Sequence, residues 1–397
     1  MYVILICLIL SKKIHLLPNY SFKIFNHTAA LPEQWNNLAN QNILLSLSYL
    51  KTLEQSSPKN VTCFFIGLYQ DAFLSGIAIA QHINLNALNS FGERDRCIKT
   101  FVRNRIFRNF CSQVLVIGNN FFTGQNAFVF SEQSNKIELV STLILAANAL
   151  KKSLKSKQQK IHITSIKDFS SQELFLFKKE IFNDFTAFST QPNMVFTINK
   201  NWTNETDYVA SLSKKYRDQY KRSHKKAEDI TKKKLELEEI KYYQKQIYNL
   251  YFYVAKNAPF NTFFLAENHF ENLKINLHEN FLFYGYFIGN ELVGFNTLIK
   301  NDLVMETYFL GYDETIQREK MLYLNMLYDM IGYSIKKHFN EIIFARTALE
   351  IKSSVGAKPI QMIAFMKHEN PIINKFMSFF INYFEPKTVW QERNPFK

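Results

Sequence analysis

The stretch from residue 281 to residue 358 constrains the fold of this 397-residue chain more than any other. It opens with three runs rich in Phe, Tyr, Val, Ile and Leu. Gly289-Asn290 separates the first run from the second, and Lys300-Asn301-Asp302 separates the second from the third; both are typical hairpin turns. We therefore predict three antiparallel strands, at about 281–288, 291–299 and 303–310.

The next segment predicts a helix and a fourth strand. Apolar residues recur at helical spacing between Met321 and Ile335, and lysines follow at the last turn. The apolar run at 341–345 follows this crossover helix, so we place it as a strand parallel to the third one. The resulting β-β-β-α-β unit brings the strand ends and the helix start to one edge of the sheet, where ligands tend to bind.

Polar side chains gather at this predicted edge. They either precede the helix or follow the last strand, which are the two places from which side chains reach a ligand bound there. The residues are Asp313, Gln317 and Arg318 before the helix, and Arg346, Thr347, Glu350, Lys352 and Ser353 after the strand.

With these residues the stretch resembles the core of the GNAT superfamily of acyltransferases. In that superfamily the loop before the helix carries a Gln/Arg-x-x-Gly-x-Gly/Ala signature, whose backbone amides hold the coenzyme A pyrophosphate. The matching residues 317–322 read QREKML, so the Gln and Arg are present and both small residues are absent. The resemblance implies acyl-CoA as a co-substrate, with no tightly bound cofactor. It places Gly311, Gln317, Arg318 and Lys320 at the cofactor site.

The first half of the chain predicts the same order of elements. A hairpin surrounds Gln70-Asp71, a short buried run ends at Gly118, and an amphipathic helix covers 136–154. A strand at 161–166, a helix over 171–183 and a strand at 194–198 complete this half. Two GNAT-like domains in tandem resemble the Fem-type aminoacyltransferases and related peptidoglycan- or lipid-modifying families.

We therefore predict an α/β (α+β) protein with two GNAT-like domains, at 1–200 and 236–397. Each would be a mixed, mostly antiparallel sheet flanked by helices. The 47% hydrophobic and 15% aromatic content indicates a globular chain long enough for two domains. Strands at about 360–366 and 384–390 would close the second domain.

The segment 201–235 is predicted to be a basic helix that joins the domains. Asn204 can cap it, and residues 214–234 contain ten Lys and Arg against three acids, a net charge of +7 out of the chain's +14. One interpretation is a solvated helix whose long side chains cover apolar surface. The other is a patch that binds tRNA, anionic lipid or carrier phosphates. The candidate polyanion-binding residues are Lys221, Arg222, Lys225 and Lys226.

Acyl transfer to an amine needs a base, donors that hold the carbonyl, and an acid for the leaving group. We name Glu306, Tyr312 and Glu350 as catalytic candidates, with a solvated strand face as the alternative for Glu306. Arg346 after the last strand needs a partner, and Glu350 at i+4 can supply one, so a structural ion pair stands beside a substrate clamp. The candidate substrate-binding residues are Asn257, Asn261, Asp313, Arg346, Thr347, Lys352 and Ser353.

Cysteine usage favours a reduced, cytoplasmic setting. The four cysteines show no CxxC and no His at ligand spacing, so neither a metal site nor a disulfide framework is predicted. The apolar run at residues 1–10 is shorter than the roughly 20 residues that span a bilayer. A buried edge strand, an upstream start and a membrane anchor all remain open for it.

Two functions follow from these features. The first is an N-acyltransferase of the GNAT or Fem kind, which moves an acyl or aminoacyl group to an amine on a small molecule, a lipid or a cell-wall precursor. The second is a non-catalytic relative that binds tRNA or an anionic membrane surface through the basic helix.

Overall fold

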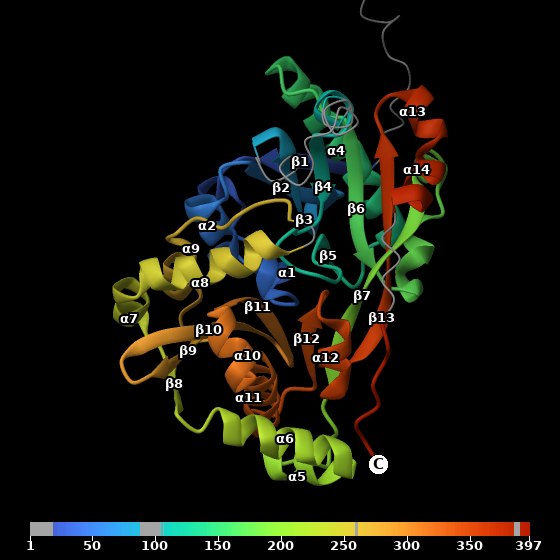
Figure 1. Ribbon diagram of the computed structural model, residues 1–397. Coiled ribbons are helices and arrows are strands. Elements are labelled where there is room, and N and C mark those ends of the chain that lie inside the picture. The colour runs from blue at the N-terminus through green and yellow to red at the C-terminus, as the bar shows by residue number, and fades with distance from the viewer. Residues whose placement is uncertain (1–18, 88–104, 106, 259–260, 385–389) are drawn as a thin grey trace, which may run out of the picture.

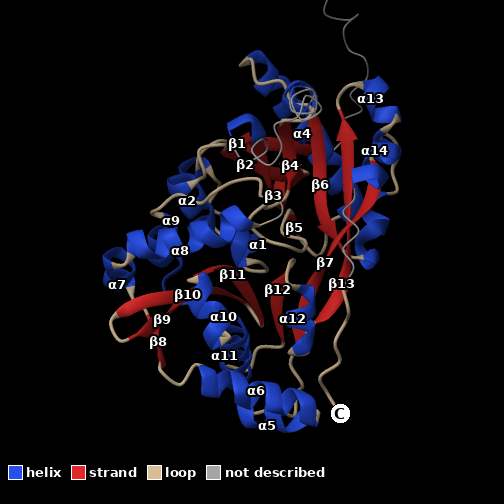
Figure 2. Cartoon of the chain, in the orientation of Figure 1, coloured by secondary structure: helices blue, strands red, loops and turns tan. Residues whose placement is uncertain are grey.

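The computed structural model describes residues 19–87, 105, 107–258, 261–384 and 390–397. Within these residues one continuous sheet of 13 strands runs through both halves of the chain (Figures 1 and 2). The strand order is β1-β2-β3-β4-β6-β13-β7-β12-β11-β10-β9-β8, with β5 paired to β3 beside this path.

The first half contributes most of one side of the sheet. Two 3-10 turns, at Ser171–Phe177 and Glu180–Phe182, replace the helix predicted over 171–183. The elements are β1 (Tyr20–Phe25), α1 (Trp35–Ala39), α2 (Leu47–Ser56), β2 (Val61–Gln70), β3 (Phe73–Asn84), β4 (Gln113–Ile117), β5 (Phe128–Phe130), α4 (Lys136–Ser156), β6 (Ile163–Phe169) and β7 (Thr186–Thr197).

The second half contains the predicted meander and its crossover helix, and these predictions are confirmed. The elements are α5 (Glu205–Ser211), α6 (Lys214–Lys226), β8 (Ile230–Lys234), α7 (Leu237–Tyr242), α8 (Gln244–Asn257), α9 (His269–Leu277), β9 (Phe281–Ile288), β10 (Glu291–Asn301), β11 (Val304–Tyr312), α10 (Glu314–Lys320), α11 (Leu322–Lys336), β12 (Glu341–Ala345), α12 (Leu349–Ser354), β13 (Lys358–His368), α13 (Pro371–Lys375) and α14 (Met377–Phe384).

The sheet is arranged symmetrically about its central pair, β7 and β13. Moving outward, β6, β4, β3, β2 and β1 on one side correspond to β12, β11, β10, β9 and β8 on the other. Each side has one parallel pair, β4 with β6 or β11 with β12, and the remaining neighbours are antiparallel. A crossover helix joins each parallel pair, α4 on one side and α11 on the other. The predicted duplication of one α/β unit is confirmed.

The two halves exchange their last strands. β13 pairs with β6 and β7 of the first half, whereas β7 pairs with β12 of the second half and with β13. The strand predicted at 360–366 therefore exists, but it lies between β6 and β7 of the first half. Because each half completes the other, the sheet has no break between them.

The basic connecting segment is two helices and a strand, so the prediction of one continuous helix is wrong. Asn204 caps α5 as predicted, through a hydrogen bond from the Asp207 N–H to its side chain. The helix stops at Leu212, which adopts an extended conformation and bridges to Phe396, and α6 starts anew after Ser213. Pairing with the C-terminal residues thus outweighs continuation of the helix.

Apolar clusters lie on both faces of the sheet. One face of the second half packs against α8 and α9, and the other against α11, α5 and α6. No helix among the described residues is both long and apolar enough to cross a membrane. The predictions for residues 1–10, and for most of the strand at 384–390, fall outside the described residues; Phe384 ends α14.

Candidate functional site

Strands β11 and β12 separate part-way along the sheet. They pair in parallel over 304–306 and 341–343, and β11 then continues to Tyr312. Over this continuation β11 stays paired with β10, while β12 stays with β7, where Ala345 pairs with Met194. Within the described chain, the β12-facing edge of residues 307–312 therefore has no strand neighbour. Such an edge offers backbone N–H and C=O groups to an amide-containing ligand.

Strands β11 and β12 diverge beyond Glu306 and Ile343, and we call the gap between them the opening. Glu306 lies at its inner end. It is the last residue of β11 that pairs with β12, and its side chain is buried. Burial raises the pKa of Glu306 to about 7, against the opposing effect of a hydrogen bond from Asn301. The alternative prediction of a solvated strand face is wrong. A carboxyl group with a pKa near neutrality is suited to accept a proton from an ammonium group.

A chain of side-chain amides connects Glu306 to the first half. The Asn301 amide donates to Asn42 Oδ1 at 3.2 Å, and Asn42 donates to Asn126 Oδ1 at 2.8 Å. Asn126 in turn donates to the Thr123 carbonyl at 3.1 Å. The loop that follows β4 is therefore held against the inner end of the opening, next to Glu306.

Aromatic rings of the same loop cover β11 next to Glu306. The Phe122 ring stacks on Tyr308 with a centroid separation of 4.7 Å, and Tyr308 lies two residues beyond Glu306 on the same face. The Tyr308 hydroxyl and His269 Nε2 are 2.8 Å apart, and burial lowers the pKa of His269 to about 4. A neutral imidazole and a tyrosine hydroxyl thus form a hydrogen-bonded pair beside Glu306.

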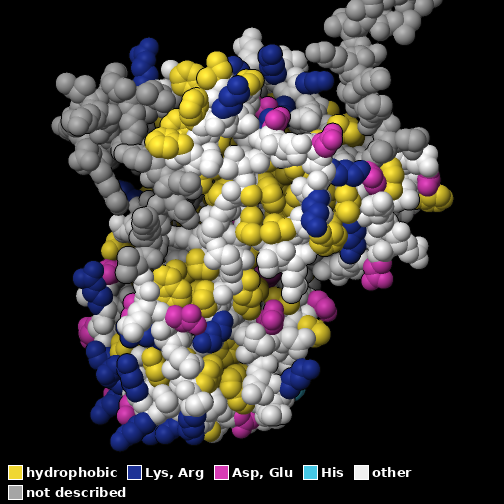
Figure 3. All heavy atoms as spheres, turned by 90° about the vertical axis from the view of Figure 1, so that its right-hand side faces the viewer, with side chains coloured by type: hydrophobic (Ala, Val, Ile, Leu, Met, Phe, Trp, Pro, Cys, Tyr) yellow, Lys and Arg dark blue, Asp and Glu magenta, His cyan; other side chains and the backbone are white. Residues whose placement is uncertain are grey.

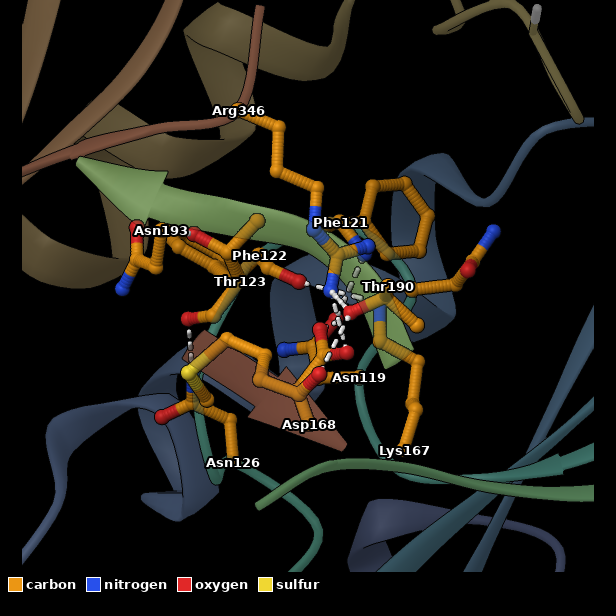
Figure 4. Close-up of polar contacts among 12 residues, drawn as sticks. Asn119, Phe121, Phe122, Thr123, Asn126, Lys167, Asp168, Thr190, Asn193 and Arg346 are labelled. Carbon is orange, nitrogen blue, oxygen red and sulfur yellow. Dashed lines mark hydrogen bonds and ion pairs between the residues drawn. The ribbon is translucent and has the colours of Figure 1, made fainter. Parts of the chain in front are cut away.

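The ends of β6 and β12 meet in a buried ion-pair cluster (Figure 4). Arg346, directly after β12, donates to the carboxylate of Asp168, which is fully buried in β6. Lys167 Nζ lies 3.3 Å from Asp168 Oδ2. Arg346 also donates to the Gln191 carbonyl at 3.1 Å and to Thr190 Oγ1 at 3.0 Å. The guanidinium therefore connects three strands across the central pair.

This geometry corrects the predicted partner of Arg346. The carboxylate beside it is Asp168 and not Glu350, which pairs with Arg393 near the C-terminus. Glu350 lies on the solvent side of α12, at the rim of a hollow of about 420 Å³ between α12 and α6. Thr347, with a positive φ of 72°, is exposed in the loop between β12 and α12.

Lys352 supports this loop from below. Its ammonium donates to three carbonyl oxygens, those of Phe344 at 2.5 Å, Ala345 at 3.3 Å and Arg346 at 2.8 Å. Burial lowers the pKa of Lys352 to about 7. All three donors are used, so Lys352 holds the backbone of the loop and has none left for a ligand. The neighbouring Ser353 hydroxyl likewise donates to a backbone carbonyl, that of Glu350.

The residues predicted at the cofactor site lie around the short helix α10. The Asp313 side chain caps it and accepts from the amides of Thr315 and Ile316, at 2.9 and 3.0 Å. These first-turn amides are therefore already satisfied. Arg318 is exposed and pairs with Glu314, and Lys320 pairs with Asp229.

Gly311 has a structural reason to be glycine. A Cβ there would lie 2.5 Å from the Leu250 carbonyl carbon and 2.6 Å from the Tyr251 nitrogen, in the backbone of α8. The position allows β11 and α8 to approach closely. Gln317, by contrast, is a partly buried residue in the middle of α10.

The three catalytic candidates do not converge. Glu306 and Tyr312 lie six residues apart on one strand, so their Cα atoms are roughly 20 Å apart at the usual rise per residue. Burial raises the pKa of the Tyr312 hydroxyl above its ordinary value. Asn257 donates to the Tyr253 carbonyl at 2.9 Å, and Asn261 to the Ala255 carbonyl at 3.5 Å. Of the three candidates, only Glu306 lies at the inner end of the opening.

Sequence reasoning missed the contribution of the first half. Lys167 and Asp168 follow the buried run at 161–166 just as Arg346 follows the run at 341–345. The rule that polar residues after a strand mark a ligand edge was applied only to the second half. Applied to both, it would have selected Lys167 and Asp168. Nothing in the local pattern marks Asn42 or Asn126.

The four predicted polyanion-binding residues are exposed along α6, on the side away from the sheet. Within the described chain none of them forms an ion pair with a protein carboxylate. Tyr216 and Ser223 face inward, and the Tyr220 hydroxyl donates to Glu205 at 2.9 Å, which fixes the helix to the second half. The residues are Lys221, Arg222, Lys225 and Lys226.

No family model matches the sequence, and no curated protein matches it. Solved structures do match. The crystal structure of FemX superposes with a TM-score of 0.52 and 12% identity, over 92% of this chain and 100% of that one. A tandem GNAT protein from the clavulanic acid biosynthesis pathway matches with a TM-score of 0.47 and 8% identity, over 88% of this chain and 98% of that one. The chain therefore shares the fold of FemX.

L-PGS from Bacillus licheniformis also matches, with a TM-score of 0.45 and 10% identity, over 85% of this chain and 97% of that one. At these identities the likeness concerns the fold. The Gly-poor loop at 317–322 is this chain's own departure from the signature.

Proposed function

We propose that this protein is a transferase that moves an acyl or aminoacyl group to an amine acceptor, with Glu306 as the general base. The observation that carries the proposal is the opening between β11 and β12 with a buried carboxyl group at its inner end. The unpaired edge of residues 307–312 supports binding of a ligand that carries amide groups, such as the arm of an acyl-CoA or a peptide-like acceptor.

In the proposed reaction Glu306 accepts a proton from the ammonium group of the acceptor. The freed amine nitrogen then bonds to the acyl carbon of the donor, and the bond from that carbon to sulfur or oxygen breaks. The adduct nitrogen gives up its extra proton to the leaving thiolate or alkoxide, which yields the neutral amide and the neutral thiol or alcohol, and the protonated Glu306 then releases its proton to water. A base with a pKa near 7 fits this exchange, because it both accepts and returns the proton at neutral pH.

The identities of the donor and the acceptor are further proposals, and they rest on the proposed transfer. Acyl-CoA and aminoacyl-tRNA are the two donor classes, and the exposed cations of α6 support the second because tRNA is a polyanion. The resemblance to Fem-type aminoacyltransferases favours a small-molecule, lipid or cell-wall-precursor acceptor with a primary amine.

The test combines binding with turnover. The full chain is melted in the presence of acyl-CoAs and, separately, titrated with aminoacyl-tRNA; a ligand at about 100 times its Kd adds roughly 2.7 kcal/mol of stability. The donor that binds is then incubated with a panel of amines. Glu306→Gln should lower kcat by about 10²–10⁴-fold and leave donor affinity unchanged. Glu291→Gln, at an exposed glutamate of β10, is the matched control.

The second candidate function is non-catalytic polyanion binding, and the four exposed cations of α6 favour it. The same experiment separates the two. If aminoacyl-tRNA binds but no amine is acylated, the transferase proposal is wrong and the binding function remains. If amines are acylated but Glu306→Gln transfers as fast as the parent, Glu306 is not the general base.

A further inference from the structure

The helix pair α13–α14 is apolar on the side that faces solvent. Phe376 links the two helices, and the Phe380 N–H donates to the Phe376 carbonyl at 3.0 Å, so the helical path continues through the junction. Ile372, Phe376 and Phe380 are spaced by four residues and share one face, and they are 71%, 56% and 39% exposed. Phe379, one position before Phe380, is also exposed.

These side chains are not needed to hold the helices in place. The neighbouring face, one residue further along the helix, does that: Met377 is buried, and Ile373 and Ile381 are partly buried at the same spacing. A surface helix normally has one apolar face and one polar face. Here the apolar surface extends from the inner face onto the solvent side, so the outward stripe, defined as Ile372, Phe376 and Phe380, requires a separate explanation.

Basic side chains lie at the same end of the molecule. The end of α4 is joined to the start of α13, because Lys151 pairs with Glu369 at 2.5 Å and the Glu369 N–H donates to the His162 carbonyl at 2.8 Å. Figure 3 shows hydrophobic side chains on the upper half of this side, with Lys and Arg around them. The exposed cations that form no ion pair within the described residues are Lys152, Lys155, Lys157, Lys160 and Lys375.

We propose that the outward stripe of α13–α14 inserts into the surface of an anionic lipid bilayer, with the lysines at the end of α4 contacting the headgroups. Aromatic and aliphatic side chains next to lysines are the composition of helices that lie in the membrane interface. The eight residues of α14 are too few to span a bilayer, so the helix lies along the surface. This docking is independent of the transfer activity.

Charge argues against a second copy of the chain as the occupant. A two-fold symmetric contact over the stripe would place the lysines of both copies around one apolar interface. The carboxylates next to α13 do not offset this, because Glu369 and Asp184 are already paired with Lys151 and Lys367. Anionic headgroups supply the missing countercharge.

Vesicle binding tests the proposal directly. The full chain should sediment with vesicles of equal parts phosphatidylcholine and phosphatidylglycerol. Changing Ile372, Phe376 and Phe380 to Ser should weaken the partition coefficient by at least about 100-fold, since fully burying one such side chain contributes about tenfold or more. The matched control changes three exposed apolar residues at other sites, Phe73, Tyr242 and Leu303, to Ser and should bind as the parent does.

The lysines and the depth of insertion give two further readouts. Changing Lys152, Lys155, Lys157 and Lys160 to Gln should weaken binding by more than about tenfold, since each lysine near an anionic surface contributes about fivefold. Phe376→Trp should show a blue-shifted emission that brominated lipid quenches. Phe73→Trp should show neither effect.

Three outcomes would overturn the proposal. One is that the parent does not bind these vesicles, and another is that the Ile372, Phe376 and Phe380 variant binds them like the parent. The third is that the parent is a dimer by sedimentation velocity while this variant is a monomer, which would assign the stripe to a second copy of the chain.

Discussion

Replacing Asp168 by Asn should destabilise the protein far more than replacing its partner Arg346. Asp168 is fully buried between two cations, so Asn leaves Arg346 and Lys167 facing each other without a countercharge. Removing one member of a buried pair typically costs about 3–5 kcal/mol. Burial already lowers the pKa of Lys167, so loss of the carboxylate drives this lysine further toward its neutral form.

Arg346→Met should cost only roughly 1–2 kcal/mol, because Lys167 remains 3.3 Å from the carboxylate and the chief loss is hydrogen bonds. The unfolding entropy of about 2.1 cal/mol/K per residue, over 397 residues, corresponds to about 1.2 °C per kcal/mol if the chain unfolds as one unit. Asp168→Asn should therefore lower Tm by about 4–6 °C, and Arg346→Met by about 1–2 °C.

Urea unfolding followed by tryptophan fluorescence measures both variants; guanidinium chloride would screen the ion pairs. The double variant completes the cycle, and a coupling energy of about 1–3 kcal/mol is expected for residues in contact. If Asp168→Asn is as stable as the parent, or if Arg346→Met is the more damaging change, the cluster does not hold the strand ends together. Unchanged donor affinity in a folded Arg346→Met variant would also remove Arg346 from the substrate site.

Three further predictions concern Glu306, Gly311 and α6. The raised pKa of Glu306 makes folding of the parent progressively less favourable as pH rises from about 4.5 to about 7. The free energy of unfolding of Glu306→Gln should therefore rise by roughly 3 kcal/mol relative to that of the parent across this window. Urea unfolding that gives the same difference between variant and parent at both pH values would contradict this. Gly311→Ala should cost about 1–3 kcal/mol in urea unfolding, because its Cβ would lie 2.5 Å from the backbone of Leu250. Replacing the four exposed cations of α6 by Gln should flatten the salt dependence of tRNA binding by roughly three units, at about 0.7 to 0.9 per phosphate contact, with stability unchanged; equal slopes would leave α6 as a solvated connector. The residues are Lys221, Arg222, Lys225 and Lys226.

The meander could be predicted because its turns are local. Gly289-Asn290 and Lys300-Asn301-Asp302 fix both hairpins within a few residues, and the helix after them shows a clear apolar period. The alternation of apolar and polar residues alone could not decide which way Glu306 faces, because both Met305 and Tyr308 can be buried and the two lie on opposite faces of a regular strand. The structure shows Glu306 buried and hydrogen-bonded to Asn301, which in turn bonds to Asn42 of the first half.

The partners of the candidate residues could not be predicted because they are distant in sequence. Arg346 and Asp168 are 178 residues apart, and Asn301 and Asn42 are 259 apart. The apolar pattern of β13 identifies a strand but does not say that it pairs with β6 and β7 of the first half. For the break between α5 and α6 a signal existed: Ser213 directly before a helical stretch is a common cap.

The strand exchange has a consequence for synthesis of the chain. When the ribosome has made the first half, β6 lacks the neighbour that only residues 358–368 provide. The nascent first half therefore waits with an open, apolar sheet edge until nearly the whole chain has emerged, and such edges are prone to wrong pairing. A gene cut between the halves would leave this edge open for good, and the two products would have to find each other to close it.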